Sequence, residues 1–329
     1  MPSSRHLPAL AAGLALLLGA CAGAPAADDA ASAAPSSSSV SGFPVTVSSC
    51  GTETTLEAPP ERVVTIKSSA TEMVIALGAG DRLVGTAFSD GPLPEGVPAP
   101  PVLAEQNPSR ESVLDLAPDL VYAGWESNLS DDGAGERAGY EELGVSTFVS
   151  PSACKDPQYQ PDPLGFEDVF AEIEQVGTML GTPEEAEALV AEQRAALEAV
   201  EPVGEGLTAV WYSSGSDTPF VGAGIGAPQM IMAAAGLENI AADVRDTWTS
   251  LSWEAVADRD PDVVVLVDSA WNTAEHKIEV LESNPVTAAL PAVQEQRFLV
   301  VPFAATEAGV RNVSAVEQLT AQLTELGYR

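Results

Sequence analysis

One short sequence pattern occurs twice in the chain, and it constrains the fold more than any other feature. Residues 110–122 and 253–265 share a glutamate at the second position, a later Pro-Asp pair, and a closing run of apolar residues. Each copy predicts a short helix that opens at Glu111 or Glu254, a break at the proline, and a buried strand. Two copies of such a unit predict two similar lobes. We therefore expect a ligand site between the lobes.

The charge of the chain limits its partners. With 48 Asp and Glu residues against 14 Lys and Arg residues, the 329-residue chain has a net charge of −34. A chain this acidic repels the phosphates of nucleic acids and of anionic surfaces, so we expect no nucleic-acid partner. Its length suffices for one large or two medium hydrophobic cores.

The first residues have the features of an export signal. Arg5 precedes an apolar stretch over residues 7–20 that is too short to cross a bilayer, and small residues lead directly into Cys21. This arrangement matches the bacterial lipoprotein signal, in which the peptide is cut before a cysteine that is then acylated. We expect residues 1–20 to be the signal peptide, Cys21 the lipidated residue and residues 21–42 a flexible tether. The alternative is ordinary secretion with cleavage nearby.

This signal predicts where the protein works. The lipid would hold it on the extracytoplasmic face of the cell membrane, and the protein would contact the membrane only through that lipid.

Two cysteines remain once Cys21 is lipidated, so a single pairing is possible. Because exported proteins meet oxidising conditions, we expect Cys50 and Cys154 to form a disulfide; the alternative is two buried free thiols. The only histidine outside the predicted signal peptide is His276. One histidine is too few for a zinc or manganese site, and it gives a catalytic thiol little support. The sequence therefore predicts no metal site.

The rest of the chain alternates predicted strands and helices, which favours parallel sheets of the βαβ type. A long helix over residues 182–201 separates two such series, and its threonine, proline and glutamate are placed as a helix start requires. We therefore expect an α/β fold with two Rossmann-like lobes and mostly parallel sheets. Residues 43–181 would form the first lobe and residues 202–329 the second, joined by that single helix.

Two local features are expected in the first lobe. Alternating residues over 43–56, with Cys50 at their centre, predict a β-hairpin. The segment from Ser69 to Glu72 predicts a capping box that opens a helix over residues 73–78.

Polar and aromatic side chains follow several predicted strands. Ligands of open parallel sheets gather at the carboxyl ends of strands, and large rings with a few polar groups suit a bulky organic ligand. Lys67 and Arg311 would add positive charge for an anionic ligand. For any one of these residues, core packing or a surface ion pair is the alternative role. The predicted ligand-binding residues are Lys67, Ser68, Ser69, Asp90, Trp125, Tyr212, Trp248, Trp271, Phe303 and Arg311.

A glycine-rich segment from Gly222 to Ala227 resembles a dinucleotide-binding fingerprint and precedes a predicted helix. That fingerprint must follow its strand directly, but a loop containing Gly215 and Pro219 separates this segment from the strand over residues 207–212. We expect a loop at the edge of the cleft. An exported nucleotide-dependent enzyme is the less favoured alternative.

Several segments together resemble the substrate-binding proteins of bacterial ABC importers, in the class for cobalamin, haem and ferric siderophores. They are the lipoprotein signal, the tether, Pro-Glu-Arg-Val-Val at residues 60–64, Ala-Thr-Glu-Met at residues 70–73, the paired glutamate segments and the long helix. The resemblance covers about residues 43–326. It implies the class III periplasmic binding protein fold, a monomer without a cofactor, and a binding role without catalysis.

The resemblance also implies specific contacts. In that family one glutamate on each lobe docks onto a dimeric permease that works with an ATPase, and Glu111 and Glu254 stand at the matching positions. Trp248 falls where cobalamin-binding members carry an aromatic residue in the cleft. The implied partners are the permease dimer with its ATPase and a small molecule such as a metal chelate, a corrinoid or haem.

Shorter segments, including residues 65–69 and 211–215, resemble an actinobacterial subgroup proposed to carry a precursor of the deazaflavin coenzyme F-420. Such a ligand is a planar aromatic molecule with a phosphate, which would suit tryptophans beside Lys67 and Arg311. A ferric siderophore, a corrinoid and a deazaflavin fit the predicted residues comparably well. The sequence leaves the ligand open, and it leaves open whether the protein transports its ligand or senses it.

Overall fold

The computed structural model describes residues 42–329, which belong to one compact unit. The predicted signal peptide, Cys21 and the tether up to residue 41 lie outside the described residues. Within residues 42–329, no helix combines the length and the apolar character that crossing a bilayer requires.

The described part begins with an antiparallel hairpin of β1 (Val45–Ser49) and β2 (Thr52–Leu56). Cys50 and Gly51 occupy its turn with φ values of 48° and 76°. Positive φ at both central residues matches the twist of the flanking strands. The predicted hairpin, with Cys50 at its centre, is confirmed.

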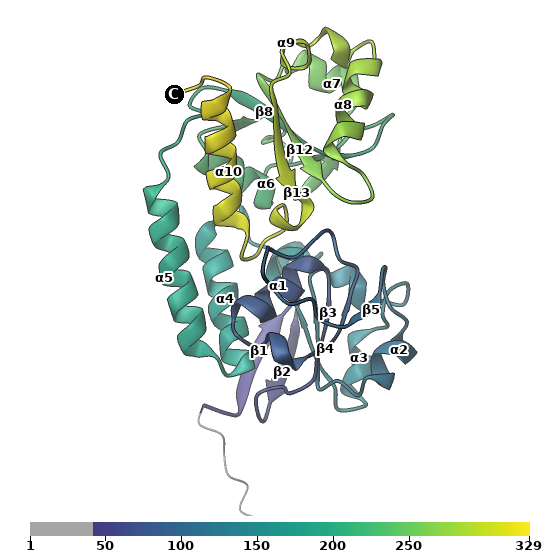
Figure 1. The fold of residues 1–329 in the computed structure, drawn as a ribbon. Helices are drawn as coiled ribbons and strands as arrows, with labels where there is room; N and C mark the ends of the chain where they lie inside the picture. The colour runs from purple at the N-terminus through teal and green to yellow at the C-terminus, as the bar shows by residue number, and fades with distance from the viewer. Residues whose placement is uncertain (1–41) are drawn as a thin grey trace, which may run out of the picture. The chain divides into compact units, whose positions relative to one another are not determined.

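The N-terminal lobe contains a five-stranded sheet in the order β5-β4-β3-β6-β7, in which all neighbours are parallel (Figure 1). β3 lies at its centre, and all of its residues are buried. The strands are β3 (Val63–Ile66), β4 (Leu83–Ala87), β5 (Val102–Ala104), β6 (Leu120–Ala123) and β7 (Ser146–Val149), and the helices among them are α1 (Ser68–Ala76), α2 (Arg110–Asp115) and α3 (Arg137–Glu141).

The C-terminal lobe contains a second sheet, in which β8, β10, β12 and β13 are parallel and β9 lies antiparallel between β8 and the edge strand β11. The predicted α/β class with two mostly parallel sheets is confirmed. The strands are β8 (Thr208–Ser214), β9 (Phe220–Gly222), β10 (Glu238–Asn239), β11 (Trp248–Ser250), β12 (Val263–Asp268) and β13 (Phe298–Pro302). The helices are α6 (Ala227–Ala234), α7 (Trp253–Asp258), α8 (Ala274–Ser283), α9 (Pro291–Gln294) and α10 (Asn312–Glu325).

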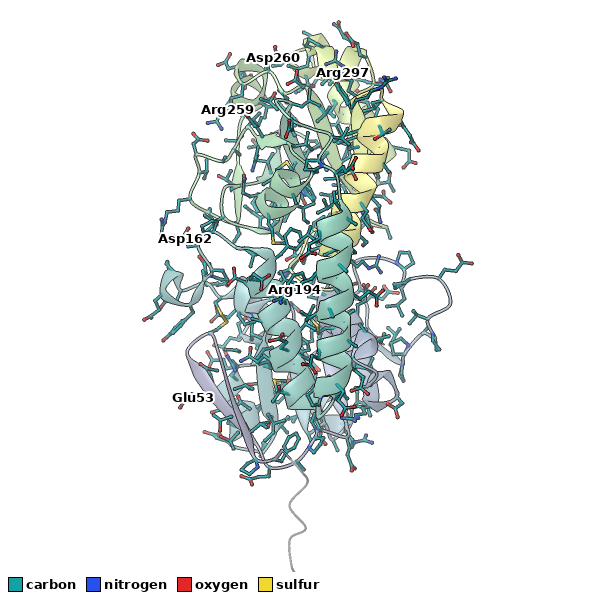
Figure 2. All side chains as sticks on the ribbon, turned by 90° about the vertical axis from the view of Figure 1, so that its left-hand side faces the viewer. Glu53, Asp162, Arg194, Arg259, Asp260 and Arg297 are labelled. Atoms are coloured by element: carbon teal, nitrogen blue, oxygen red, sulfur yellow. A yellow bond between two sulfur atoms is a disulfide. The ribbon has the colours of Figure 1, made fainter. Side chains whose placement is uncertain are left out.

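Helices α4 (Phe166–Leu180) and α5 (Pro183–Ala199) pack against each other, and α5 carries the chain from the first lobe to the second (Figures 1 and 2). α4 ends at Gly181, whose φ of 69° is the left-handed conformation common after helices. The two helices approach closely at Gly177, where an added Cβ would lie 2.4 Å from the Cβ of Ala186. The sequence predicted a joining helix over residues 182–201, and α5 corresponds to it.

Both copies of the repeat form the same local structure. α2 starts after Ser109 and α7 after Ser252, and each serine side chain accepts a hydrogen bond from the backbone N–H three residues later. Glu111 and Glu254 are the second residues of these helices, where exposed carboxylates interact favourably with the helix dipole. Each lobe thus presents one exposed carboxylate at the same position of the same helix.

The Pro-Asp pairs tie each copy of the repeat to a neighbouring strand. Asp119 accepts hydrogen bonds from the backbone N–H groups of Glu61 and Arg62, just before β3. Asp262 accepts one from the N–H of Thr208, the first residue of β8. The repeated motif therefore fixes its own strand against a neighbouring strand of the same sheet.

The start of α1 differs from the prediction. The helix begins at Ser68, and no side chain caps its first turn, so the predicted capping box of Ser69 and Glu72 was wrong. Lys67 has a φ of 85°, and the chain turns directly from β3 into α1 at this residue. Glu72 then lies one turn inside the helix, where its carboxylate binds Arg311.

Candidate ligand-binding cleft

A cleft of about 840 Å³ lies between the lobes, within the size range of sites for organic ligands. The N-terminal lobe lines it with residues that come after β3, β4 and β6 and with parts of the segment 152–164. The C-terminal lobe lines it with the end of β8, the start of β9, the start of α6, the start of β11 and the segment 303–308. Its aromatic residues are Phe88, Trp125, Phe220, Trp248, Trp271 and Phe303.

Lys67 lies in the N-terminal wall of the cleft, and its side chain is fully covered. The ammonium group forms an ion pair with Asp90 and lies 3.7 Å from the ring centroid of Trp125 and 4.0 Å from that of Phe88. The ring of Phe303, from the other lobe, is 5.0 Å away. Ring faces attract an ammonium group, and they do so most strongly where water is excluded. The positive charge of Lys67 is therefore balanced by groups of the protein itself.

Burial acts on both members of this ion pair. The loss of water lowers the pKa of Lys67, and the charge of Asp90 opposes that shift. Burial likewise raises the pKa of Asp90 against the attraction of Lys67 and a hydrogen bond of 3.2 Å from the backbone N–H of Ser68. Each charge thus offsets the desolvation of the other, and removing one would leave the other buried alone.

Trp125 reaches Lys67 because the residue before it is a glycine. A Cβ on Gly124 would lie 2.8 Å from the Cβ of Lys67 and 2.6 Å from the Oγ of Ser69. Only a residue without a side chain allows the end of β6 to approach the start of α1 this closely.

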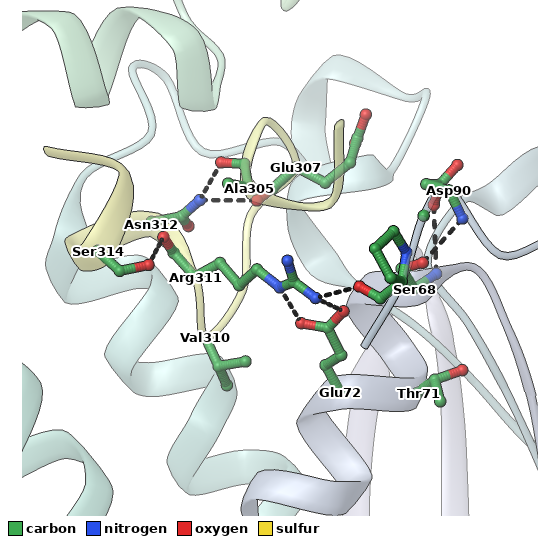
Figure 3. Close-up of polar contacts among 12 residues, drawn as sticks. Ser68, Thr71, Glu72, Asp90, Ala305, Glu307, Val310, Arg311, Asn312 and Ser314 are labelled. Carbon is green, nitrogen blue, oxygen red and sulfur yellow. Dashed lines mark hydrogen bonds and ion pairs between the residues drawn. The ribbon is translucent and has the colours of Figure 1, made fainter. Parts of the chain in front are cut away.

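Glu307 brings a carboxylate from the C-terminal lobe to the same wall. Its Oε2 accepts a hydrogen bond of 3.1 Å from the indole Nε1 of Trp125. Burial raises the pKa of Glu307 to about 6, while the charge of Lys67 and the hydrogen bond from Trp125 act in the opposite direction. The segment that carries it is held by Asn312, whose amide Nδ2 donates to the carbonyls of Ala305 (3.1 Å) and Glu307 (2.7 Å) (Figure 3).

Arg311 is occupied by contacts within the protein. Its guanidinium binds both carboxylate oxygens of Glu72 on α1 and donates to the carbonyl of Pro92 at 3.0 Å (Figure 3). Burial raises the pKa of Glu72, and the arginine opposes that shift. This bidentate ion pair links the segment before α10 to the N-terminal lobe. Arg311 is not among the residues that line the cleft.

The structure divides the ten predicted ligand-binding residues into two groups. Those that line the cleft are Lys67, Trp125, Trp248, Trp271 and Phe303. Those that lie outside the lining are Ser68, Ser69, Asp90, Tyr212 and Arg311. In the second group, Asp90 binds Lys67, and the Tyr212 hydroxyl donates to the carbonyl of Gly215 at 2.9 Å.

Several lining residues were not predicted from the sequence. Phe88 comes directly after β4, so the rule that ligands gather at strand ends was sufficient to identify it, but the residue was overlooked. Phe220 opens β9, where its ring stacks on Trp248 with centroids 5.7 Å apart. Glu307 had no such signal, because it comes after a short turn rather than a strand.

The glycine-rich segment lies at the edge of the cleft, as predicted. Its first residue ends β9, which runs antiparallel to β8, so the segment does not follow a parallel strand as a dinucleotide fingerprint does. A Cβ on Gly224 would lie 2.3 Å from the carbonyl oxygen of Ala242, which explains one of its glycines by close packing. Ile225, Gly226 and Ala227 line the cleft.

A disulfide joins Cys50 to Cys154, with Cα atoms 5.1 Å apart. It ties the turn of the first hairpin to the segment 152–155, which lines the cleft. Glu111 and Glu254 are exposed and stand outside the cleft lining. Among residues 42–329, no group of three or more His, Cys, Asp or Glu side chains is placed to hold a metal ion.

Comparison with known families gives one clear match. Residues 63–305 match the family described as periplasmic binding protein. Among curated proteins, the chain is 26% identical to an uncharacterized ABC transporter substrate-binding lipoprotein, YvrC, of Bacillus subtilis, over 84% of both chains. It is 27% identical to the vitamin B12-binding protein of Pectobacterium carotovorum, over 82% of this chain and 90% of that protein.

Solved structures show the same arrangement of elements. A periplasmic binding protein from Veillonella parvula superposes with a TM-score of 0.74 at 25% identity, covering 84% of this chain and 96% of that chain. The structure of an ABC-type Fe3+-hydroxamate transport system from Saccharomonospora viridis superposes with a TM-score of 0.72 at 27% identity, covering 85% and 99%.

Proposed function

The chain belongs to the periplasmic binding protein family, and from this premise we propose that it captures a bulky metal chelate or corrinoid in the inter-lobe cleft and delivers it to an ABC importer. Members of this family are extracytoplasmic substrate-binding proteins of transporters, so the chain is a binding protein and not an enzyme. The observation that carries the proposal is the cleft of about 840 Å³ with aromatic residues from both lobes. Large rings around a site of this size suit a ligand with an extended apolar face.

The lining favours a ligand that brings its own metal ligands. Protein-bound haem iron is held by His, Cys, Met or Tyr. None of these residue types lines the cleft in the described part of the chain. A corrinoid or a ferric siderophore needs no protein ligand to its metal, and the names of the relatives point to vitamin B12 and to Fe3+-hydroxamate. We therefore place haem behind these two classes.

The test of this function is the identity of the bound molecule. The protein should be purified from its native host without refolding, and its absorbance spectrum and native mass recorded. We expect a corrin spectrum or a ferric charge-transfer band, with a matching mass increase. A deazaflavin spectrum would identify a different ligand and leave the proposed transport role unchanged. Turnover of a nicotinamide cofactor without a retained ligand would contradict the proposal.

We further propose that Glu111 and Glu254 are the contacts with a dimeric permease, and that Cys21 carries the lipid anchor. The two carboxylates are exposed and occupy equivalent positions on α2 and α7. Changing both to lysine should abolish uptake of the ligand by intact cells and leave its affinity for the purified protein unchanged. An affinity loss as large as the uptake loss would contradict the docking role. Normal uptake of the double variant would show that the permease binds elsewhere.

A further inference from the structure

The two cations that suggested an anionic ligand are both neutralised inside the protein. Lys67 pairs with Asp90 beneath the rings of Trp125 and Phe88, and its side chain has no exposed area. Arg311 pairs with Glu72, and the side chains are 17% and 4% exposed. Neither charge is offered to a molecule in the cleft.

The charged groups that remain in the lining are mostly acidic. Three carboxylates belong to the lining: Glu126, Asp246 and Glu307. Besides Lys67, the lining contains one lysine, Lys155, which is exposed. Within residues 42–329, no ion pair involves Lys155 or any of the three carboxylates. A cleft whose available charges are mainly of one sign concentrates the electrostatic field, and this cleft lies in a chain whose net charge is −34. The cleft therefore repels anions.

Glu307 gives this charge a specific position. Its carboxylate is held by the indole N–H of Trp125, and Figure 3 shows its side chain extending away from the ion pair of Arg311 and Glu72. The ring of Phe303 lies 5.6 Å from that of Trp271, centroid to centroid. A carboxylate in an aromatic wall attracts a cation by its charge, and the negative faces of the rings add to that attraction.

We propose that the cleft selects by charge: it accepts flat aromatic ligands or metal complexes whose net charge is zero or positive, places their most positive edge at Glu307, and rejects anionic ones. This inference rests on the cleft being the binding site of the proposed function, and it narrows that function. Among ferric chelates it favours neutral or cationic complexes over polyanionic ones. It also removes the reason for expecting a ligand phosphate beside Lys67 and Arg311.

A matched series of probes tests this selection. N-methylacridinium, acridine and acridine-9-carboxylate share one ring system and are cationic, neutral and anionic at pH 7.5. Affinities should be measured by calorimetry or by quenching of tryptophan fluorescence. We expect N-methylacridinium to bind at least about tenfold more tightly than acridine-9-carboxylate, with acridine between them.

The variant Glu307→Gln locates the effect. It should weaken N-methylacridinium about fivefold to tenfold and leave acridine unchanged, because it removes charge and keeps the shape. Glu192→Gln, which removes one exposed carboxylate on α5, is the matched control and should change neither affinity. Equal losses in the two variants would show that only the overall charge acts, and the role of Glu307 would fall.

A pH series gives an independent measurement. The groups that face Glu307 are Lys67, Asp90 and the indole of Trp125, and they leave its pKa at about 6. The affinity for N-methylacridinium should therefore fall between pH 7.5 and pH 5 in the wild-type protein, but not in Glu307→Gln. A pH dependence that persists in the variant would assign it to another group and contradict the proposal.

The outcomes separate this inference from the proposed function. Tighter binding of acridine-9-carboxylate would overturn charge selection and leave the binding role intact. If none of the three probes binds, the cleft is not an aromatic-ligand site and the inference falls. The transport role is then decided separately by the molecule that co-purifies with the protein.

Discussion

The two walls of the cleft are built from the same repeated unit and end differently. In the N-terminal lobe, β6 leads into Gly124 and Trp125, which pack onto the buried pair of Lys67 and Asp90. In the C-terminal lobe, β12 leads toward Trp271, whose side chain is 56% exposed. One wall satisfies its own polar and aromatic groups, and the other leaves large apolar surface open to a ligand.

The two copies of the repeat share their structural contacts and differ in the residues that follow them. The serine caps and the aspartates of the Pro-Asp pairs do the same work in both lobes, so the repeat is a scaffold. The residues directly after each repeated strand differ between the lobes, and those that follow β6 and β12 include Trp125 and Trp271 in the cleft lining. We expect changes in the N-terminal wall to affect stability first, and changes in the C-terminal wall to affect binding first.

The largest expected effect is on the N-terminal wall. Lys67→Met removes the partner of Asp90 and leaves a buried carboxylate alone, so the free energy of unfolding should fall by about 3–5 kcal/mol. The measurement is urea unfolding at pH 7.5, followed by tryptophan fluorescence.

The control for this variant is the double change Lys67→Met with Asp90→Asn. It removes both charges, so it should recover much of the lost stability, because the penalty comes from the unpaired charge. If the double variant is less stable than the single one, the wall is held by packing of the lysine stem and not by the ion pair.

The second prediction concerns a buried acid behind the N-terminal wall. Glu172 on α4 accepts a hydrogen bond of 2.9 Å from the Tyr122 hydroxyl, and burial raises its pKa to about 7. Its pKa is therefore higher in the folded protein than in the unfolded chain. The folded state holds the proton more tightly, so this group stabilises the fold fully at low pH. That stability is lost as the pH rises through about 7.

Glu172→Gln should remove this pH dependence. Relative to the wild-type protein, the variant should gain roughly 2–3 kcal/mol of unfolding free energy between pH 4.5 and pH 8. The matched control is Glu174→Gln, an exposed carboxyl on the same helix, which should show no such gain. Parallel curves for Glu172→Gln and the wild-type protein would mean that folding does not raise the pKa of Glu172.

How much of this was predictable depends on the range of each interaction. The strands and their ends follow from local apolar runs and from proline and aspartate breaks, so the sequence predicted the α/β class, and half of the predicted ligand-binding residues line the cleft. The pairing of Glu72 with Arg311 did not, because it joins residues from opposite lobes. Glu307 was missed for the same reason: its carboxylate is placed at the cleft by a hydrogen bond from Trp125, which is far away in the chain.

Lys67 shows a different failure. Its position at the end of a strand was predicted correctly, but its charge was assigned to a ligand. Which charge a buried lysine neutralises depends on the turn it adopts, and its φ of 85° was not visible in the pattern of residues. A strand end predicts where a side chain lies and not whether its charge remains available.

The smallest expected effect on stability is on the C-terminal wall. Trp271→Ala removes a ring that is 56% exposed, so the free energy of unfolding should change by less than about 0.5 kcal/mol. The same change should weaken binding of N-methylacridinium about tenfold, because exposed aromatic rings in a binding site contribute mainly to the complex. Trp271→Phe should recover part of this affinity by restoring a ring face. A loss of stability comparable to that of Lys67→Met, or an unchanged affinity, would mean that the two walls do not differ as proposed, since the C-terminal ring would then serve the fold and not the ligand.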